Sequence, residues 1–224
     1  MSRAAALPLA WQAQSVLLSY PDEQLPGRLP VLRRAASAAG ARAGHPLHRF
    51  LDHAARTPLP DLAADYVATF DHRKRCCLFL TYYAHGDTRK RGMALLQLKQ
   101  SYAAAGLRLT DDELPDHLAV VLEFAAIAGA DAGKNLLQQH RAGIELLRLA
   151  LAEAASPWAD VLASVSATLP PLHGEERRAV ARLAAQGPPE EQVGLEPFAP
   201  PEYMPQSPYA PQPLLSPQPR GGRR

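Results

Sequence analysis

The sequence is poor in the residues that an extended β-sheet or a disulfide framework requires. Its 224 residues include 9 Val, 2 Ile and 6 Thr against 41 Ala, and this composition disfavours strands while it favours helices. The two cysteines, Cys76 and Cys77, are adjacent, and adjacent cysteines rarely reach disulfide geometry. An exported protein held together by disulfides is therefore not indicated. We predict an all-α fold with two reduced thiols.

Long apolar runs and a strong net charge are also missing. No run approaches the roughly 18 apolar residues of a transmembrane helix. Gln12, Gln14 and Ser15 interrupt the apolar segment near the N-terminus before any convincing signal-peptide cleavage site. The formal net charge is only +2, which provides no global field for nucleic acid. We predict a cytoplasmic protein without direct membrane insertion.

Proline is concentrated at one end of the chain. Residues 187–224 hold 11 of the 22 prolines, and this density excludes a helix there. The boundary predicts two parts, a compact helical domain over residues 1–186 and a Pro-rich, flexible C-terminal tail over residues 187–224. Composition alone assigns the tail no function.

Apolar periodicity, capping residues and helix breakers predict a series of helices before the tail. Asp87 is the expected N-cap of a helix that Gly106 ends. A helix that starts at Pro115 is apolar on most of its sides, so we expect it to be the central buried element. The expected helices cover about 8–19, 23–39, 46–56, 60–70, 78–84, 88–105, 115–127, 132–155 and 175–186, with one more that begins at Trp158.

The motifs of catalysis and metal binding are not found in the sequence. His45, His48 and His53 cluster with Asp52, but no Glu-x-x-His pair of the kind used by metal-binding bundles occurs. Residues 129–135 imitate a phosphate loop, yet one residue is missing between the glycines and Asn replaces the Ser or Thr. We expect no catalytic residue, no metal and no cofactor, and therefore no enzyme.

Charge is distributed in two opposite blocks. Residues 72–99 carry seven bases and one acid, and residues 109–133 carry six acids and no Lys or Arg, which gives net charges of +6 and −6. The blocks either neutralise each other across neighbouring helices or polarise the surface so that it binds a charged peptide. An α-helical regulatory or nucleic-acid-binding module that acts through residues 72–99 is the alternative. The acidic block argues against it because it would repel phosphate.

Four motifs occur in order along the chain: Tyr-Val-Ala-Thr-Phe-Asp at 66–71, Tyr-Ala-His-Gly-Asp-Thr-Arg-Lys-Arg-Gly at 83–92, Tyr-Ala-Ala-Ala-Gly-Leu at 102–107 and Glu-Leu-Pro-Asp-His-Leu at 113–118. Together they resemble the NarJ family of nitrate reductase assembly chaperones. The similarity extends over about residues 11–185 and is strongest between 66 and 126.

The resemblance implies a TorD-like all-helical fold and a function as a dedicated cytoplasmic chaperone. Members of this family bind the apo catalytic (alpha) subunit of respiratory nitrate reductase, including its N-terminal segment, in a transient complex. They assist insertion of the molybdenum cofactor and assembly of the complex before it docks on the membrane. They are not part of the finished enzyme.

The resemblance also assigns partner-binding roles to residues of two motifs. Residues 113 and 115–117 match the acidic-Pro-Asp-His hinge of the wider superfamily. The residues that match the nitrate reductase branch are His85, Gly86, Asp87, Arg89 and Gly92. Tyr83 and Arg91 belong to the same second motif. The expected partner-binding residues are Tyr83, His85, Asp87, Arg89, Arg91, Glu113, Asp116 and His117.

The same residues have structural interpretations as well. Asp87 is expected to cap a helix, Gly92 to permit close helix approach and Pro115 to start a helix. His117 is the better candidate for partner contact or a response to pH. Ala119 departs from the family, in which a second proline is common, and this departure predicts a slightly different start of the helix.

Our main hypothesis is a helical groove that captures an amphipathic peptide of the catalytic subunit. A nucleotide-responsive chaperone is a second possibility, because some members of the superfamily are reported to bind guanine nucleotides near the hinge. The sequence has no phosphate loop that would support nucleotide binding.

Overall fold

A computed structural model describes residues 3–110 and 113–186. These residues form eleven α-helices, a short 3₁₀ helix (η1) and no β-strand, so the prediction of an all-α fold is confirmed. The predicted tail, residues 187–224, lies outside the described residues. In chain order the helices are α1 (Arg3–Leu18), α2 (Leu25–Ala38), α3 (Gly40–Arg56), α4 (Leu59–Phe70), η1 (Lys74–Cys76), α5 (Leu80–His85), α6 (Arg89–Ala104), α7 (Leu118–Ile127), α8 (Ala130–Gln139), α9 (Arg141–Glu153), α10 (Trp158–Thr168) and α11 (Gly174–Gln186).

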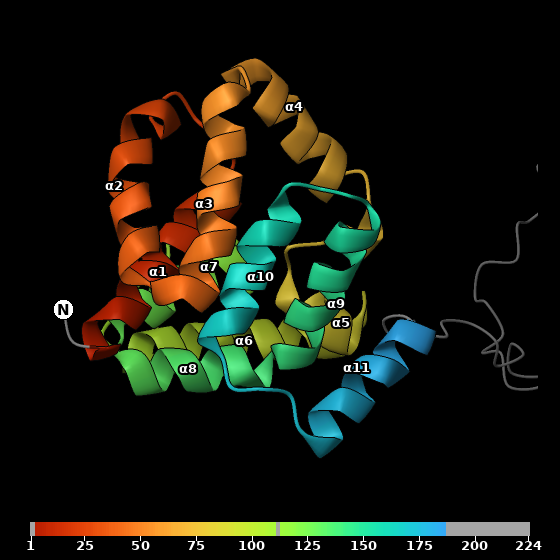
Figure 1. The fold of residues 1–224 in the computed structure, drawn as a ribbon. Coiled ribbons are helices and arrows are strands. Elements are labelled where there is room, and N and C mark those ends of the chain that lie inside the picture. Colours follow the sequence, from red (N-terminus) through yellow and green to blue (C-terminus); the bar gives the residue numbers. More distant parts are fainter. Residues whose placement is uncertain (1–2, 111–112, 187–224) are drawn as a thin grey trace, which may run out of the picture. The chain divides into compact units, whose positions relative to one another are not determined.

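Helix α7 occupies the centre of the domain, as its apolar sequence predicts. It packs against α1 on one side and against α8 on another (Figure 1). Leu118, Val121, Leu122 and Ala125 have no exposed surface. Burying apolar side chains on several faces of one helix removes a large apolar area from water, which is the main stabilising contribution to such a core.

A second part of the core forms where α10 packs on α3 and α1. The ring of Trp158 lies 5.4 Å from that of Phe50, 5.5 Å from that of Phe70 and 5.6 Å from that of Tyr66. Its indole N–H donates to the carbonyl of Leu17 at 3.1 Å, so the one polar atom of this buried side chain is satisfied.

Glycines permit three close helix contacts, at Gly44, Gly133 and Gly143, but not at the expected position. A Cβ added at Gly133 of α8 would lie 2.4 Å from the Cα of Ala125 in α7, and one added at Gly143 of α9 would lie 3.0 Å from the ring of Tyr83. Gly92, predicted to permit close helix approach, is exposed and has no neighbouring atom within 4 Å of such a Cβ. That prediction is wrong because no other described helix approaches α6 at Gly92.

Three predicted helix boundaries also need correction. The single helix expected over 132–155 is divided at His140, because α8 packs on α7 whereas α9 packs on α5, α10 and α11, and one straight helix could not reach both sets of partners. The helix expected to start at Pro115 starts at Leu118. The helix expected over 46–56 begins earlier, at Gly40, and contains Pro46 in its interior.

The predicted N-cap at Asp87 is a further correction. Thr88 is the N-cap residue of α6. It has an extended backbone, and its side chain accepts no capping hydrogen bond. Its hydroxyl donates instead to the carbonyl of His85 at 2.7 Å. The carboxylate of Asp87 pairs with Arg91 one turn further along the helix.

Both cysteines are free thiols, Cys76 buried and Cys77 half-buried, and burial raises the pKa of each thiol. None of the described helices is long and apolar enough to cross a bilayer.

Candidate functional site

Two chain segments distant in sequence, residues 78–80 and residues 116–118 of the fourth motif, meet at the start of α7. The Leu80 N–H donates to the carbonyl of Asp116 at 2.9 Å, and the Leu118 N–H donates to the carbonyl of Leu78 at 2.9 Å. This antiparallel bridge places Phe79 opposite His117, with ring centroids 5.4 Å apart in an edge-to-face arrangement. The bridge explains why α7 starts at Leu118, since the Asp116 carbonyl and the Leu118 N–H pair with residues 78–80 and His117 between them has an extended backbone.

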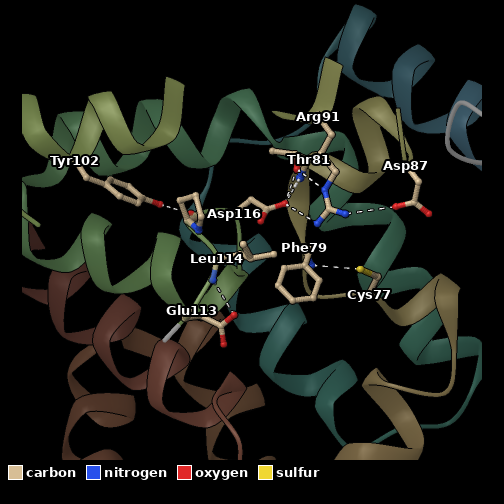
Figure 2. A network of polar contacts seen from close by, with 10 residues as sticks. Cys77, Phe79, Thr81, Asp87, Arg91, Tyr102, Glu113, Leu114 and Asp116 are labelled. Carbon is tan, nitrogen blue, oxygen red and sulfur yellow. Dashed lines mark hydrogen bonds and ion pairs between the residues drawn. The ribbon is translucent and has the colours of Figure 1, made fainter. Parts of the chain in front are cut away.

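Asp116 is the centre of a buried polar network (Figure 2). Its side chain has no exposed surface. One oxygen, Oδ2, accepts hydrogen bonds from the backbone N–H of Thr81 at 3.2 Å and from the Thr81 hydroxyl. Arg91 lies 3.6 Å from the same oxygen. The carboxylate therefore joins the first turn of α5 to the first turn of α6, and a buried charge is stable only when it is paired and hydrogen-bonded in this way.

Arg91 extends the network towards the surface. Its guanidinium donates to the Thr81 hydroxyl at 3.3 Å and to the exposed Asp87 at 3.4 Å, and it lies over the ring of Phe79, 5.7 Å from the centroid (Figure 2). Of the ion pairs within the described ranges, Arg91–Asp116 alone joins the basic block to the acidic block. Among the described residues of the two blocks, direct pairing therefore neutralises little of the charge.

The backbone before α7 is held by two further contacts. The Tyr102 hydroxyl of α6 donates to the carbonyl of Pro115 at 2.6 Å. His117 is the N-cap of α7, and its Nδ1 accepts a hydrogen bond from the N–H of Ala119 at 3.3 Å. This contact requires Nδ1 to be unprotonated. Burial lowers the pKa of His117, although the carboxylates of Glu113 and Asp116 oppose the shift.

Beside this network lies a recess that we call the acidic groove. It consists of two adjoining hollows of about 490 Å³ and 370 Å³, which share Ser15, Ser19, Tyr20 and Glu123. The floor is apolar, and the acids of the groove come from four different places in the chain. Its apolar lining includes Phe70, Leu78, Phe79, Leu109 and Val120, and its acids are Asp22, Asp71, Glu113 and Glu123.

The acidic groove has a strongly negative charge balance. Its one Arg or Lys among the lining residues, Arg28, lies 3.8 Å from Asp22. Asp71, Glu113 and Glu123 are exposed and form no ion pair with any residue that the structure describes. An apolar floor with uncompensated carboxylates is suited to a segment that carries apolar and basic side chains together. Such a surface repels the phosphates of nucleic acid.

The structure separates the eight predicted partner-binding residues into three groups. Glu113 and His117 line the acidic groove. Asp87, Arg91 and Asp116 form the network behind it. The other three lie elsewhere: Tyr83 is buried with its hydroxyl bonded to the carbonyls of Arg75 and Cys77, His85 is half-buried at the end of α5, and Arg89 is exposed at the start of α6.

Sequence reasoning missed several residues of this region. Thr81, which donates twice to Asp116, lies in the helix predicted over 78–84 and outside the four motifs. Asp22 and Tyr20 line the groove although they are far from the four motifs in sequence. Asp71 is the last residue of the first motif, so its position in that motif could have identified it as a candidate site residue. Within residues 3–110 and 113–186, no group of three or more His, Cys, Asp or Glu is placed to hold a metal ion.

Comparison with known proteins identifies relatives of this chain. A family model described as "Nitrate reductase delta subunit" matches residues 34–164. The chain is 35% identical over 163 residues to the probable nitrate reductase molybdenum cofactor assembly chaperone NarJ of Bacillus subtilis, covering 72% of this chain and 88% of that protein. It is 37% identical over 116 residues to the chaperone NarJ of Escherichia coli K12, covering 50% of this chain and 49% of that protein.

A larger protein matches as well. The nitrate reductase-like protein NarX of Mycobacterium tuberculosis is 39% identical over 160 residues, or 71% of this chain. The matched region is 24% of NarX, so the chain spans about a quarter of that relative's length.

Proposed function

The chain belongs to the nitrate reductase delta subunit family, and from this premise we propose that it is a dedicated assembly chaperone for a respiratory nitrate reductase. In this proposal it binds the apo catalytic subunit, including its N-terminal segment, and assists insertion of the molybdenum cofactor before the complex docks on the membrane. The names of the NarJ relatives support this function. In this proposal the complex between the chain and the catalytic subunit is transient and forms in the cytoplasm. The chain has no catalytic activity of its own.

The observation that carries the proposal is the acidic groove with its apolar floor. A client segment that forms a short amphipathic helix would bury its apolar face on the half-buried Phe79, Leu109 and Val120. Each Å² of apolar surface removed from water contributes roughly 25 cal/mol. Basic side chains on the edges of that helix would meet Asp71, Glu113 and Glu123. These rim charges orient the segment, and by raising its association rate at low salt they also tighten its binding.

The Asp116 network has a positioning role in this proposal. It does not reach the groove surface itself, because the carboxylate is fully buried. It fixes the backbone that presents Glu113 and His117, through the bridge to residues 78–80 and through Thr81 and Arg91. Asp116 therefore acts on client binding through the shape of the groove and not by direct contact.

Titration of the full chain with a peptide of the first ~15 residues of the cognate catalytic subunit, a length sufficient for a short helix in a groove, tests the proposal. We expect Glu113→Gln with Glu123→Gln to weaken binding about tenfold at low salt, and the difference to shrink as salt screens the charges. A matched control is Asp131→Asn with Glu175→Gln, two exposed acids outside the groove. Unchanged affinity and unchanged salt dependence in the groove variant would contradict the proposal.

A further inference from the structure

A second recess, which we call the basic hollow, lies between η1, α5, α9 and α11. It consists of two adjoining hollows of about 430 Å³ and 410 Å³ that share Lys74, Arg75, Ala150 and Glu153. It shares no lining residue with the acidic groove. One of its walls is α11, which packs on α9 (Figure 1) and begins at Gly174, beyond the residues that the family model matches. The basic hollow therefore includes residues of α11 that lie outside residues 34–164, the range that the family model matches.

The floor of the basic hollow is an apolar stripe along α9. Leu146, Leu149 and Ala150 line it at helical spacing, and Glu153 continues the same face at its end. Leu149 is 44% exposed although it is a large apolar residue. Leu183 of α11 faces the stripe from the opposite wall. A stripe with this spacing between two walls has the form of a groove that receives another helix.

Cations gather where the stripe ends. Arg73 and Lys74 are exposed and form no ion pair with other described residues. Arg75 lies 3.4 Å from Glu153, but the two side chains are 75% and 67% exposed, and an ion pair so exposed contributes little. The end of the hollow therefore presents three bases and one acid, a charge balance opposite to that of the acidic groove.

We propose that the basic hollow is a second client-binding surface, which takes an acidic amphipathic helix. The inference rests on the proposed function in naming the apo catalytic subunit as the source of that helix. The apolar face of the helix lies on Leu146, Leu149 and Leu183, and carboxylates at one of its ends replace Glu153 as partners of Arg75 and pair with Arg73 and Lys74. Two recesses of opposite charge let one chaperone hold two client segments of different sequence without competition between them.

Site-specific photo-cross-linking of the full chain to the purified apo catalytic subunit tests this. A benzophenone amino acid replaces Leu149 in the basic hollow, Val120 in the acidic groove, or Met93, which is 61% exposed on α6 and lines neither recess. We expect Leu149 to cross-link to a client segment rich in Asp, Glu and apolar residues, Val120 to cross-link to a different segment, and Met93 to give no specific product.

The outcomes separate the two proposals. A Val120 product without a Leu149 product overturns the second surface and leaves the proposed function intact. No product at either position removes the support for both. A Leu149 product with another copy of this chain, or with a basic client segment, also overturns the inference, because the hollow would then have a different occupant.

A charge-reversal pair gives an independent measurement. We expect Arg73→Glu with Lys74→Glu to weaken binding of the whole apo subunit at least tenfold and to leave binding of the N-terminal peptide unchanged. Lys90→Glu with Lys99→Glu makes the same change of net charge at exposed positions outside the hollow and should alter neither. Equal effects of the two pairs would overturn the inference.

Discussion

Asp116 shows how a single buried carboxylate organises the candidate site. It accepts both the backbone and the hydroxyl hydrogen bonds of Thr81 and lies against Arg91, all on one oxygen. Its other oxygen, Oδ1, is buried and has no hydrogen-bond partner among the described residues. All the groups that stabilise the negative charge of Asp116 therefore contact Oδ2, so the loss of Thr81 or Arg91 should strongly affect the local structure.

Replacing this carboxylate by its neutral isostere tests its contribution. We expect Asp116→Asn to lower the free energy of unfolding by about 2 kcal/mol, because hydrogen bonds to a charged group are lost and the Arg91 guanidinium loses a partner. Asp87→Asn is the matched control, since Asp87 contacts the same arginine but is 78% exposed, and it should not change stability measurably. Urea unfolding followed by tryptophan fluorescence is the measurement, and equal effects of the two variants would show that the burial of Asp116 has no energetic importance.

His117 should make stability depend on pH. Burial lowers its pKa in the folded chain below the ordinary value near 6.5, so the unfolded chain binds the proton more tightly. Stability is therefore complete above pH 6.5 and decreases as the pH falls from 6.5 towards the lowered pKa. His117→Asn keeps a side chain that accepts at the N-cap but does not titrate, and we expect it to lose less stability between pH 7.5 and pH 5.5 than the unmodified chain. A decrease as large as that of the unmodified chain would contradict this assignment.

Among the helices, α7 and α8 depend on the absence of one side chain. Gly133→Ala places a Cβ 2.4 Å from the Cα of Ala125 and 2.6 Å from its Cβ. The two helices must separate to accommodate it, and we expect a loss of about 2 kcal/mol in urea unfolding. Gly92→Ala is the control, because Gly92 is helical, exposed and free of neighbours. It should stabilise the chain by about 0.5–1 kcal/mol through helix propensity.

The helices were largely predictable, and their ends less so. Periodicity located α4 and α6 to within a residue at each end, because strong breakers flank them. The helix over 132–155 was wrong because the break at His140 has no Gly or Pro to mark it and results from packing against two different sets of helices. The start of α7 was displaced because a backbone bridge with Leu78 and Leu80, distant in sequence, competes with helix formation at residues 115–117.

Within the site, the sequence motifs identified single residues but did not predict the groove that these residues form with others. Asp116 and Arg91 were identified, but their mutual contact and the part of Thr81 depend on tertiary structure. The acidic groove combines Asp22, Asp71, Glu113 and Glu123, which come from separate segments, so no local pattern in the sequence predicts it. The membership of the family, in contrast, was predicted from the motifs and is confirmed.

At the scale of the whole molecule, the division between domain and tail remains a prediction. Every residue of the described core lies at or before Leu169. We therefore expect a chain of residues 1–186 to unfold cooperatively in urea at the same midpoint as the full chain, within experimental error. Trp11 and Trp158, both buried, report the transition in each case. A lower midpoint for the shorter chain would show that residues 187–224 contribute to the stability of the domain.

The bridge between residues 78–80 and 116–118 also has a consequence for local opening. It joins positions about 35 residues apart and so closes a loop that contains α6. Most residues of α6 are exposed, and only Leu98 and Tyr102 are buried. The turns of α6 between Arg91 and Tyr102 can therefore unwind while the bridge and the contacts of these two side chains keep both ends of the loop in place. In native-state hydrogen exchange, the amides of α6 should exchange by this local route, well before those of Leu80, Leu118 and the body of α7.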